Sequence, residues 1–214
     1  MNRTLCVRGE GSVRLVPDRI RLEITLRASN PDSARAMAAM EEQLASLKQA
    51  LENEGFAPDA LKTADYAVEA QRENVPDERG IYREVFTGFA CVQHLALEFA
   101  ADNMLLSKAL TAVSICEADP ELNVRYLVSD RRAAEEQLLR AAAENARRSA
   151  ELLAGASGVT LGELISIRYD RPEHDLFSRS ELRYRGKAAV YADAAFSPEE
   201  IELSDSAVFV WVLE

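Results

Sequence analysis

The chain has 214 residues, of which 48% are apolar and 29% are charged, and its formal net charge is −11 at pH 7. This composition is typical of a soluble globular protein, and the length suits one large domain or two small intertwined halves. The negative charge repels phosphate backbones and anionic lipid, so we expect neither nucleic acid binding nor membrane insertion.

Isolated thiols and the absence of targeting signals indicate where the protein works. The three cysteines, Cys6, Cys91 and Cys116, form no C-x-x-C pair, and the two histidines, His94 and His174, are far from metal-ligand spacing. Such thiols favour a reducing compartment over a disulfide framework. The first residues, MNRTLCVRGEG, contain no apolar run of signal-peptide length, and no stretch approaches the roughly 20 apolar residues of a membrane span. We expect a cytoplasmic protein with no metal site and no cofactor.

Two extended segments meet at Pro17-Asp18, where the apolar positions change phase. Before this point Leu5, Val7, Val13 and Leu15 are odd-numbered, and the apolar residues after it are even-numbered from Ile20 to Ala28. A one-residue slip exchanges the two faces of a strand, and proline cannot donate to a strand ladder. The pattern therefore predicts a bend between two strands, of which the second is antiparallel with one wet face.

The segment Gly9-Glu10-Gly11 resembles a phosphate-binding turn only superficially. A phosphate loop needs a helix N-terminus directly behind it, and this segment leads into another strand. We interpret it as a turn or bulge.

A helix is predicted after the second strand, with Asn30 as N-cap, Pro31 at its first position and Gly55 at its end. Its apolar residues form one stripe: Met37, Met40, Leu44, Leu47 and Leu51. Two strands follow, at 61–71 and 85–100, and residues 72–80 are predicted to be a polar hairpin loop. In the second strand, His94 faces away from the apolar side chains, as a surface or sheet-face residue does.

The second half of the chain repeats this order. Residues 102–116 suit a short helix capped by Asp102, and 123–129 suit a strand. A long helix is predicted at 130–154, with small buried residues that let it lie close to a sheet; Gly158 ends it, and a strand follows at 161–169. The last strand, from Ala207, is apolar on both faces, which predicts a place inside the sheet or at a subunit contact.

The predicted fold class is α+β, with two strand–helix–strand–strand halves and a mainly antiparallel sheet on which a long helix from each half packs. We expect a single domain over residues 1–214, with halves at about 1–100 and 120–214 joined by the short helix.

Four segments together resemble the SIMPL-domain family over nearly the whole chain. They are VRGEGSVRLVPDRIRLEITL, EGFAPDALKTADYAV, FTGFACVQHLALEF and the helix pattern Ala142, Ala146-Arg147, Ala150-Glu151, Leu153-Ala154, Gly158 and Leu161-Gly162. The resemblance implies that the glycines near the N-terminus are scaffold. It also implies an associating or protective bacterial protein, since some members form large homo-oligomeric rings, and it carries over no catalytic residues. Without a signal or anchor, the chain looks like the cytoplasmic subgroup.

A charged segment at 170–186 is the main candidate for chemistry. We interpret it as a mobile loop, and residues from there to Pro198 remain ambiguous. It combines a histidine with carboxylates and arginines: Arg168, Asp170, Arg171, Glu173, His174, Asp175, Arg179, Arg183 and Arg185. Such a set could form a His-carboxylate site or bind an anionic ligand, but a solvated loop has the same composition.

Other reactive side chains have simpler explanations. No nearby cation activates the thiol of Cys91, so we expect it to be a buried structural cysteine. The helix carboxylates Glu135, Glu136, Glu144 and Glu151 alternate with arginines and are better explained by surface ion pairs than by a metal site.

Two functional hypotheses follow. The first is a non-enzymatic protein that self-assembles and binds an unidentified protein partner. The second is a small-molecule-binding protein or hydrolase that uses the loop around His174. We assign no catalytic, cofactor-binding or metal-binding residue.

Overall fold

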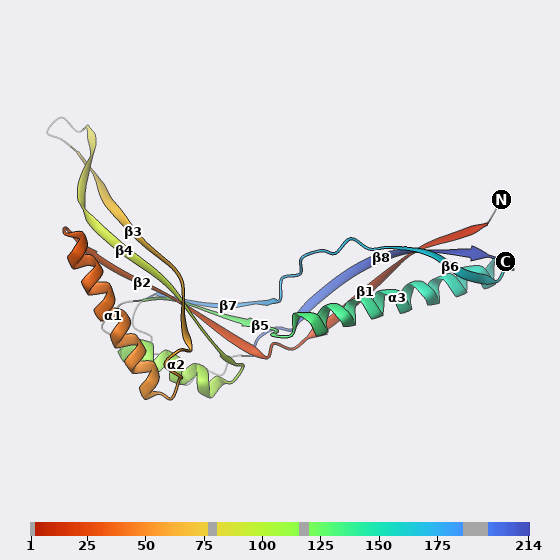
Figure 1. Cartoon of the computed structure of the whole chain (residues 1–214), viewed down its shortest axis with the longest axis horizontal. Helices are drawn as coiled ribbons and strands as arrows, with labels where there is room; N and C mark the ends of the chain where they lie inside the picture. The colour runs from red at the N-terminus through yellow and green to blue at the C-terminus, as the bar shows by residue number, and fades with distance from the viewer. Residues whose placement is uncertain (1–2, 77–80, 116–119, 186–196) are drawn as a thin grey trace. The chain divides into compact units, whose positions relative to one another are not determined.

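The computed structural model describes residues 3–76, 81–115, 120–185 and 197–214, and these contain three helices and eight strands (Figure 1). The strands form two sheets, with the orders β1-β8-β6 and β3-β4-β2-β5-β7. The pairings β1–β8, β6–β8, β2–β4, β2–β5 and β3–β4 are antiparallel. The α+β prediction is therefore confirmed, although the strands are divided between two sheets.

The chain forms two compact units. The α1 unit comprises Asp18–Leu127 and Ser180–Pro198, and the α3 unit comprises Met1–Pro17, Val128–Arg179 and Glu199–Glu214. The boundary between Pro17 and Asp18 coincides with the predicted bend, since the first strand ends at Leu15 and the second begins at Arg19 in the other sheet. Each unit is built from segments that are far apart in the chain. A single domain with halves at 1–100 and 120–214 stays a prediction.

The α1 unit is built on the five-stranded sheet. Its elements are β2 (Arg19–Asn30), α1 (Ser33–Asn53), β3 (Leu61–Pro76), β4 (Tyr82–Ala100), α2 (Asn103–Ile115), β5 (Glu121–Leu127) and, from Ser180 on, the strand β7 (Phe177–Arg185). The even-numbered side chains of β2 from Ile20 to Leu26 are fully buried and pack against α1 and α2. The odd-numbered ones line the opposite, polar face of the sheet, which we call the open face. The alternation predicted for β2 is confirmed.

The α3 unit consists of β1 (Thr4–Leu15), α3 (Arg131–Ala156), β6 (Leu161–Arg168) and β8 (Ile201–Leu213). Strand β1 pairs along its full length with β8. The buried residues of α3 are mostly alanines spaced four apart, and they contact Val7, Phe209 and Trp211. Figure 1 shows α3 running alongside β1 and β8. The predicted long helix with small buried residues is confirmed.

The segment Gly9–Gly11 is a straight part of β1, so its interpretation as a turn or bulge was wrong. Gly9 is paired with Ala207, and Gly11 with Asp205. A Cβ on Gly11 would lie 2.2 Å from the backbone oxygen of Leu138 in α3. The glycines are therefore needed for close approach of the helix and not for a change of chain direction.

Helix α1 begins two residues later than predicted. Asp32 is its N-cap, and its Oδ1 accepts from the backbone N–H of Arg35 at 3.0 Å. Asn30 instead ends β2, and its side chain accepts from Asp32 N. Both residues are good caps, so local preference alone did not decide between them. Met37, predicted in the buried stripe, is 41% exposed.

Other predicted ends agree with the structure. The Asp102 side chain accepts from Met104 N at the start of α2. Gly55 follows α1 with φ +93°, and Gly158 follows α3 with φ +72°; these are left-handed conformations that favour glycine.

Two predicted loops contain strand residues. Residues 72–76 continue β3 and pair with Tyr82–Phe86, so the hairpin is longer than expected; residues 77–80 lie outside the described part. The charged segment at 170–186 is not a loop throughout, because Phe177–Arg185 form β7. Its core-facing positions include Ser178 and Ser180, which hid the alternation. Residues 186–196 also lie outside the described part.

The C-terminal strand β8 is the central strand of its sheet, as one of the two predicted alternatives required. Ala207, Phe209 and Trp211 are buried under α3, whereas Val208 and Val210 on the other face are half-buried. The strand is therefore fully covered on one face only.

Among the helices of the described residues, none combines the length and the apolar content that crossing a bilayer requires.

Candidate functional site

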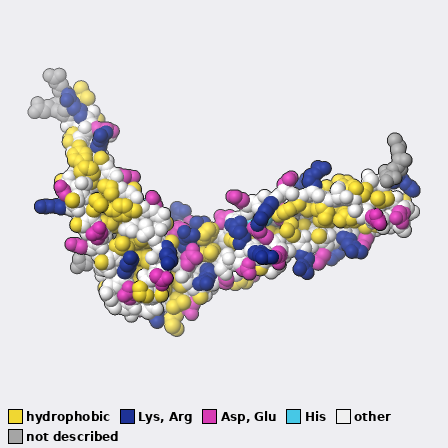
Figure 2. Space-filling view, in the orientation of Figure 1, with side chains coloured by type: hydrophobic (Ala, Val, Ile, Leu, Met, Phe, Trp, Pro, Cys, Tyr) yellow, Lys and Arg dark blue, Asp and Glu magenta, His cyan; other side chains and the backbone are white. Residues whose placement is uncertain are grey.

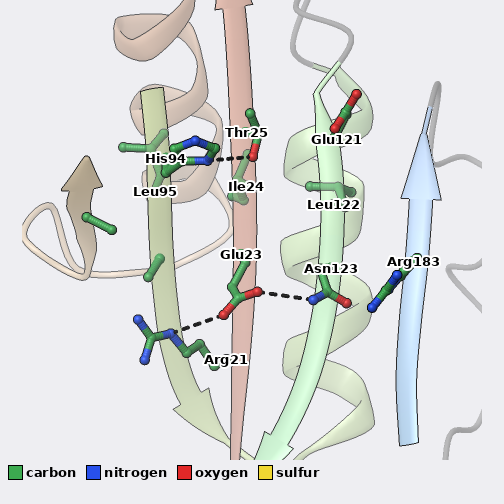
Figure 3. A pocket seen from close by; sticks show the side chains of 12 residues that line it. Arg21, Glu23, Ile24, Thr25, His94, Leu95, Glu121, Leu122, Asn123 and Arg183 are labelled. Atoms are coloured by element: carbon green, nitrogen blue, oxygen red, sulfur yellow. Dashed lines mark hydrogen bonds and ion pairs between the residues drawn. The ribbon is translucent and has the colours of Figure 1, made fainter. Parts of the chain in front are cut away.

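The open face of the five-stranded sheet carries a pocket of about 550 Å³, lined by residues of β2, β3, β4, β5 and β7 (Figure 3). Strand pairing arranges its side chains in rows. In the first row, Arg21 of β2 lies opposite Glu98 of β4 and Arg125 of β5. In the next row, Glu23 lies between Ala96 and Asn123.

The third row closes the pocket with Thr25 between His94 and Glu121. The Thr25 hydroxyl and His94 Nδ1 are 3.0 Å apart and share a hydrogen bond. His94 is exposed on the open face, so its predicted place on a sheet face is confirmed.

Small residues make the face hollow. Ala96 stands beside Glu23 where the neighbouring rows have larger side chains, and Ala64 lies at an irregularity of β3 between Thr63 and Asp65. An irregularity of this kind bends a strand and changes the direction of its side chains. The pocket thus has a floor of small apolar groups and walls of charged and polar ones.

Glu23 is the central acid of the pocket. Its Oε2 accepts from Asn123 Nδ2 at 3.1 Å, and its Oε1 lies 3.7 Å from Arg21 Nε and 3.9 Å from Arg125 Nη1. Figure 3 shows Arg21 and Asn123 approaching Glu23 from opposite sides. The arginine distances exceed the 2.7–3.2 Å of a hydrogen bond, so these are loose ion pairs with room for another group.

A second polar cluster lies in the α3 unit, where the charged segment meets β8. His174 Nε2 lies 3.4 Å from Asp205 Oδ2, and the two side chains are 10% and 5% exposed. The Tyr169 hydroxyl donates to the same oxygen at 2.7 Å, and Ser206 N donates to Asp205 Oδ1. His174 also lines a cleft of about 580 Å³ together with Arg14, Asp175 and Arg179, among others.

Tyr169 is held in its neutral form by this cluster. Burial raises the pKa of Tyr169 to about 12, and the hydrogen bond to Asp205 and the charge of Asp205 add to this effect. The cluster can thus orient the His174 ring and keep a proton on the Tyr169 phenol. These are properties of a buried hydrogen-bond network that holds neighbouring segments together.

Of the remaining charges of segment 170–186, Glu173, Asp175 and Arg179 line the cleft with His174, and others lie elsewhere. Arg171 bonds Glu135 of α3, and Arg131 donates to the backbone oxygen of His174 at 3.1 Å. Arg183 belongs to β7 and lines the pocket on the open face. The side chain of Arg185 lies outside the described part. The segment is thus fastened to α3 by polar contacts rather than left as a solvated loop.

The other candidate side chains are structural. Cys91 is buried and Cys6 is exposed, each with a free thiol, and Cys116 lies outside the described part. The predicted surface ion pairs of α3 are present: Arg132–Glu136 and Arg147–Glu151, both at 2.9 Å.

Sequence reasoning missed the pocket around Glu23. The alternation of β2 shows that Arg21, Glu23 and Thr25 share a polar face, but not which strands lie beside it. Asn123 and Ala96 join Glu23 only through pairing of residues far apart in the chain. The polar odd positions of β2 were the one available signal.

Comparison with known proteins now places the chain. No curated protein matches its sequence. Residues 5–211 match the family model described as SIMPL, protein of unknown function (DUF541), which confirms the predicted resemblance. The match extends over both units, including β1, β8 and the strands that line the pocket. The chain therefore belongs to the SIMPL family.

Proposed function

We propose that this protein is a non-enzymatic, self-associating module whose partner is a second copy of itself, with further protein binding as a consequence of assembly. The observation that carries the proposal is the apolar surface of β6. Leu164, Ile165 and Ile167 are 46%, 52% and 56% exposed within a strand of eight residues. Folded proteins seldom leave so many large apolar side chains on one short edge strand unless something covers them.

The surroundings of β6 support a docking surface. Leu164 is paired with Trp211 and Ile167 with Phe209, so these side chains continue the apolar face of β8. A cavity of about 550 Å³ lies there, between α3 and β6. Figure 2 shows apolar side chains gathered on this side of the α3 unit.

Contact through side chains suits this edge better than addition of a strand. The pairing of β6 with β8 is irregular between Leu161 and Leu164 and again between Leu164 and Ser166. Irregularities of this kind hinder an incoming strand. A second copy is the partner to test first, since the resemblance is to a family with ring-forming members. We also propose that the protein is located in the cytoplasm.

The test replaces the apolar surface without changing the strand. The variant L164T/I165T/I167T places threonine, a β-branched residue that favours a strand, at all three positions. We expect light scattering after size exclusion to give the wild type the mass of two or more chains of 23.7 kDa each. The variant should have a smaller mass, because fewer chains associate. Leu152→Gln, at an exposed apolar residue of α3, is the control and should behave as wild type. A variant with an unchanged oligomeric mass contradicts the role of β6.

The second hypothesis, a ligand-binding protein or hydrolase around His174, has the His174–Asp205 pair as its specific support. A carboxylate that orients a histidine is a common feature of general bases. The chain offers a matched control, because its other histidine is His94. Under this hypothesis, His174→Ala abolishes hydrolysis of an activated ester probe such as p-nitrophenyl acetate, and His94→Ala does not. Equal hydrolysis by both variants removes the hypothesis.

A further inference from the structure

The pocket on the open face of the α1 unit contains buried polar atoms whose hydrogen-bonding capacity is unused. Arg21 Nε and Asn123 Oδ1 are buried, and neither makes a hydrogen bond among the described residues. The first is a donor and the second is an acceptor. Glu23 lies between them, with Oε1 3.7 Å from the Arg21 Nε and Oε2 bonded to the Asn123 amide.

Buried polar groups without hydrogen bonds are uncommon in folded proteins, and they carry the cost of lost hydration. A site with an unused donor and an unused acceptor, one on each side of a carboxylate, is suited to a ligand that offers the complementary pair. The Arg21 side of the pocket, which offers the donor, suits an anionic acceptor on the ligand. The side of Glu23 and Asn123, which offers acceptors, suits a cationic donor.

The charge of the lining supports a ligand that is neutral overall. Arg21 and Arg183 are balanced by Glu23 and Glu121. A strongly anionic ligand would meet the two carboxylates, and a simple cation would meet the two guanidinium groups. A zwitterion matches both halves of the pocket.

We propose that this pocket binds a free α-amino acid. Its carboxylate accepts from Arg21, and its ammonium group donates to Glu23 and to Asn123 Oδ1. In an α-amino acid both groups are attached to one carbon and are therefore adjacent, as the Arg21 and Glu23 side chains are. The side chain of the ligand lies over Ala96 and Ala64, where the floor is small and apolar.

The contacts at Arg21 and at Asn123 Oδ1 can form only if both side chains turn slightly, because Arg21 Nε and Asn123 Oδ1 are both covered in the free protein. The Arg21 side chain is 33% exposed, and its ion pairs with Glu23 and Glu98 are long, at 3.7 and 3.5 Å. A loosely paired guanidinium can exchange one carboxylate for another at little cost. Arg183, which is 79% exposed at the rim, is free of this constraint and bonds Glu181.

Isothermal titration of the full chain with each of the twenty amino acids tests the proposal. We expect saturable binding of at least one amino acid, with one site per chain. The N-acetyl derivative and the amide of that amino acid lack one charge each, and both should bind at least about tenfold more weakly, since a hydrogen bond between charged groups is lost. No saturable binding by any amino acid overturns the proposal.

Two variants assign the binding to this pocket. Arg21→Gln and Glu23→Gln should each weaken binding at least about tenfold while leaving the far-ultraviolet circular dichroism spectrum unchanged. Arg27→Gln is the matched control, because Arg27 is an exposed arginine of the same strand that does not line the pocket, and it should bind as wild type. Binding that survives both pocket substitutions places the ligand elsewhere and contradicts the proposal. If Arg27→Gln loses binding together with the pocket variants, the loss is a general effect of charge, and this result also contradicts the proposal.

Discussion

Gly9 of β1 lies directly against Ala142 of α3, where a Cβ on the glycine would come within 2.1 Å of the alanine's backbone oxygen. The same Cβ would lie 2.6 Å from the Cβ of Ala146. Glycine on the strand and alanine on the helix therefore set the distance between the two elements. The close approach explains why a glycine-x-glycine segment and an alanine-rich helix occur in one chain.

Gly9→Ala should destabilise the α3 unit. The new methyl group meets backbone, which cannot move aside as a flexible side chain can, so α3 must shift from β1. We expect the free energy of unfolding to fall by about 3 kcal/mol, at the upper end of the cost of overpacking. Denaturant unfolding followed by circular dichroism measures it. Gly155→Ala, at an exposed helix position with nothing within 4 Å, is the control and should be neutral or slightly stabilising. Equal midpoints for the two variants contradict this packing.

Trp211→Ala should be among the most destabilising truncations in the α3 unit. The indole is 7% exposed and stacks on Phe209 with ring centroids 5.6 Å apart. Truncation of a large buried aromatic side chain costs about 3–5 kcal/mol. Val210→Ala, on the half-buried face of the same strand, should cost clearly less. Chemical denaturation compares the two, and an unchanged midpoint for Trp211→Ala shows that β8 is peripheral to the fold.

Asp205→Ala should leave three donors without their acceptor, namely the Tyr169 hydroxyl, His174 Nε2 and the backbone N–H of Ser206. Breaking such a buried cluster costs about 3 kcal/mol or more. Asp205→Asn keeps an acceptor oxygen and should cost less. Thermal unfolding of the two variants beside the wild type provides the measurement, and two variants as stable as wild type would mean that the cluster contributes nothing.

Tyr169 should make stability depend on pH in the alkaline range. Its pKa is about 12 in the folded protein, against an ordinary value of 10.0. The folded state therefore keeps a proton that the unfolded chain loses between these values. The stabilisation is complete below about pH 10 and decreases as the pH rises towards 12.

The variant Tyr169→Phe removes this titration. We expect its denaturant midpoint to fall less steeply than that of wild type between about pH 9 and about pH 11. Tyr82→Phe, at a tyrosine that is 70% exposed, is the control and should follow the wild type. Identical slopes for wild type and Tyr169→Phe contradict the role of this phenol.

Local patterns predicted the elements of this fold well where one face is dry and the other wet. The even-numbered residues of β2 are apolar because they contact the helices, and the phase change at Pro17 marks the boundary between the two units. The alanine spacing of α3 predicted both its length and its close packing. In each case the residues that carry the signal are neighbours in the sequence.

Prediction was wrong where the deciding contact is distant in the chain. Nothing local shows that Gly9 lies under α3, so a strand glycine was interpreted as a turn. Strand β7 escaped notice because serines occupy two of its core-facing positions, so that Leu182 is left as an isolated apolar residue facing the core beside the neighbouring strand β5.

The two polar sites have the same physical origin. Glu23 meets Asn123 across a separation of 100 residues, and His174 meets Asp205 across 31. The sequence selected His174 from its charged neighbours, but Asp205 and Tyr169, which hold it in place, were not foreseen. The Glu23 site is assembled by strand pairing, and the His174 site by contact of the segment after β6 with β8. Neither can be predicted before the arrangement of these elements is known.

The central claim is self-association, and its most direct test is light scattering coupled to size exclusion, on the purified full-length chain at two concentrations. The account predicts one discrete oligomer at both concentrations, with the mass of two or more chains of 23.7 kDa each. A single species of 23.7 kDa at both concentrations would contradict it.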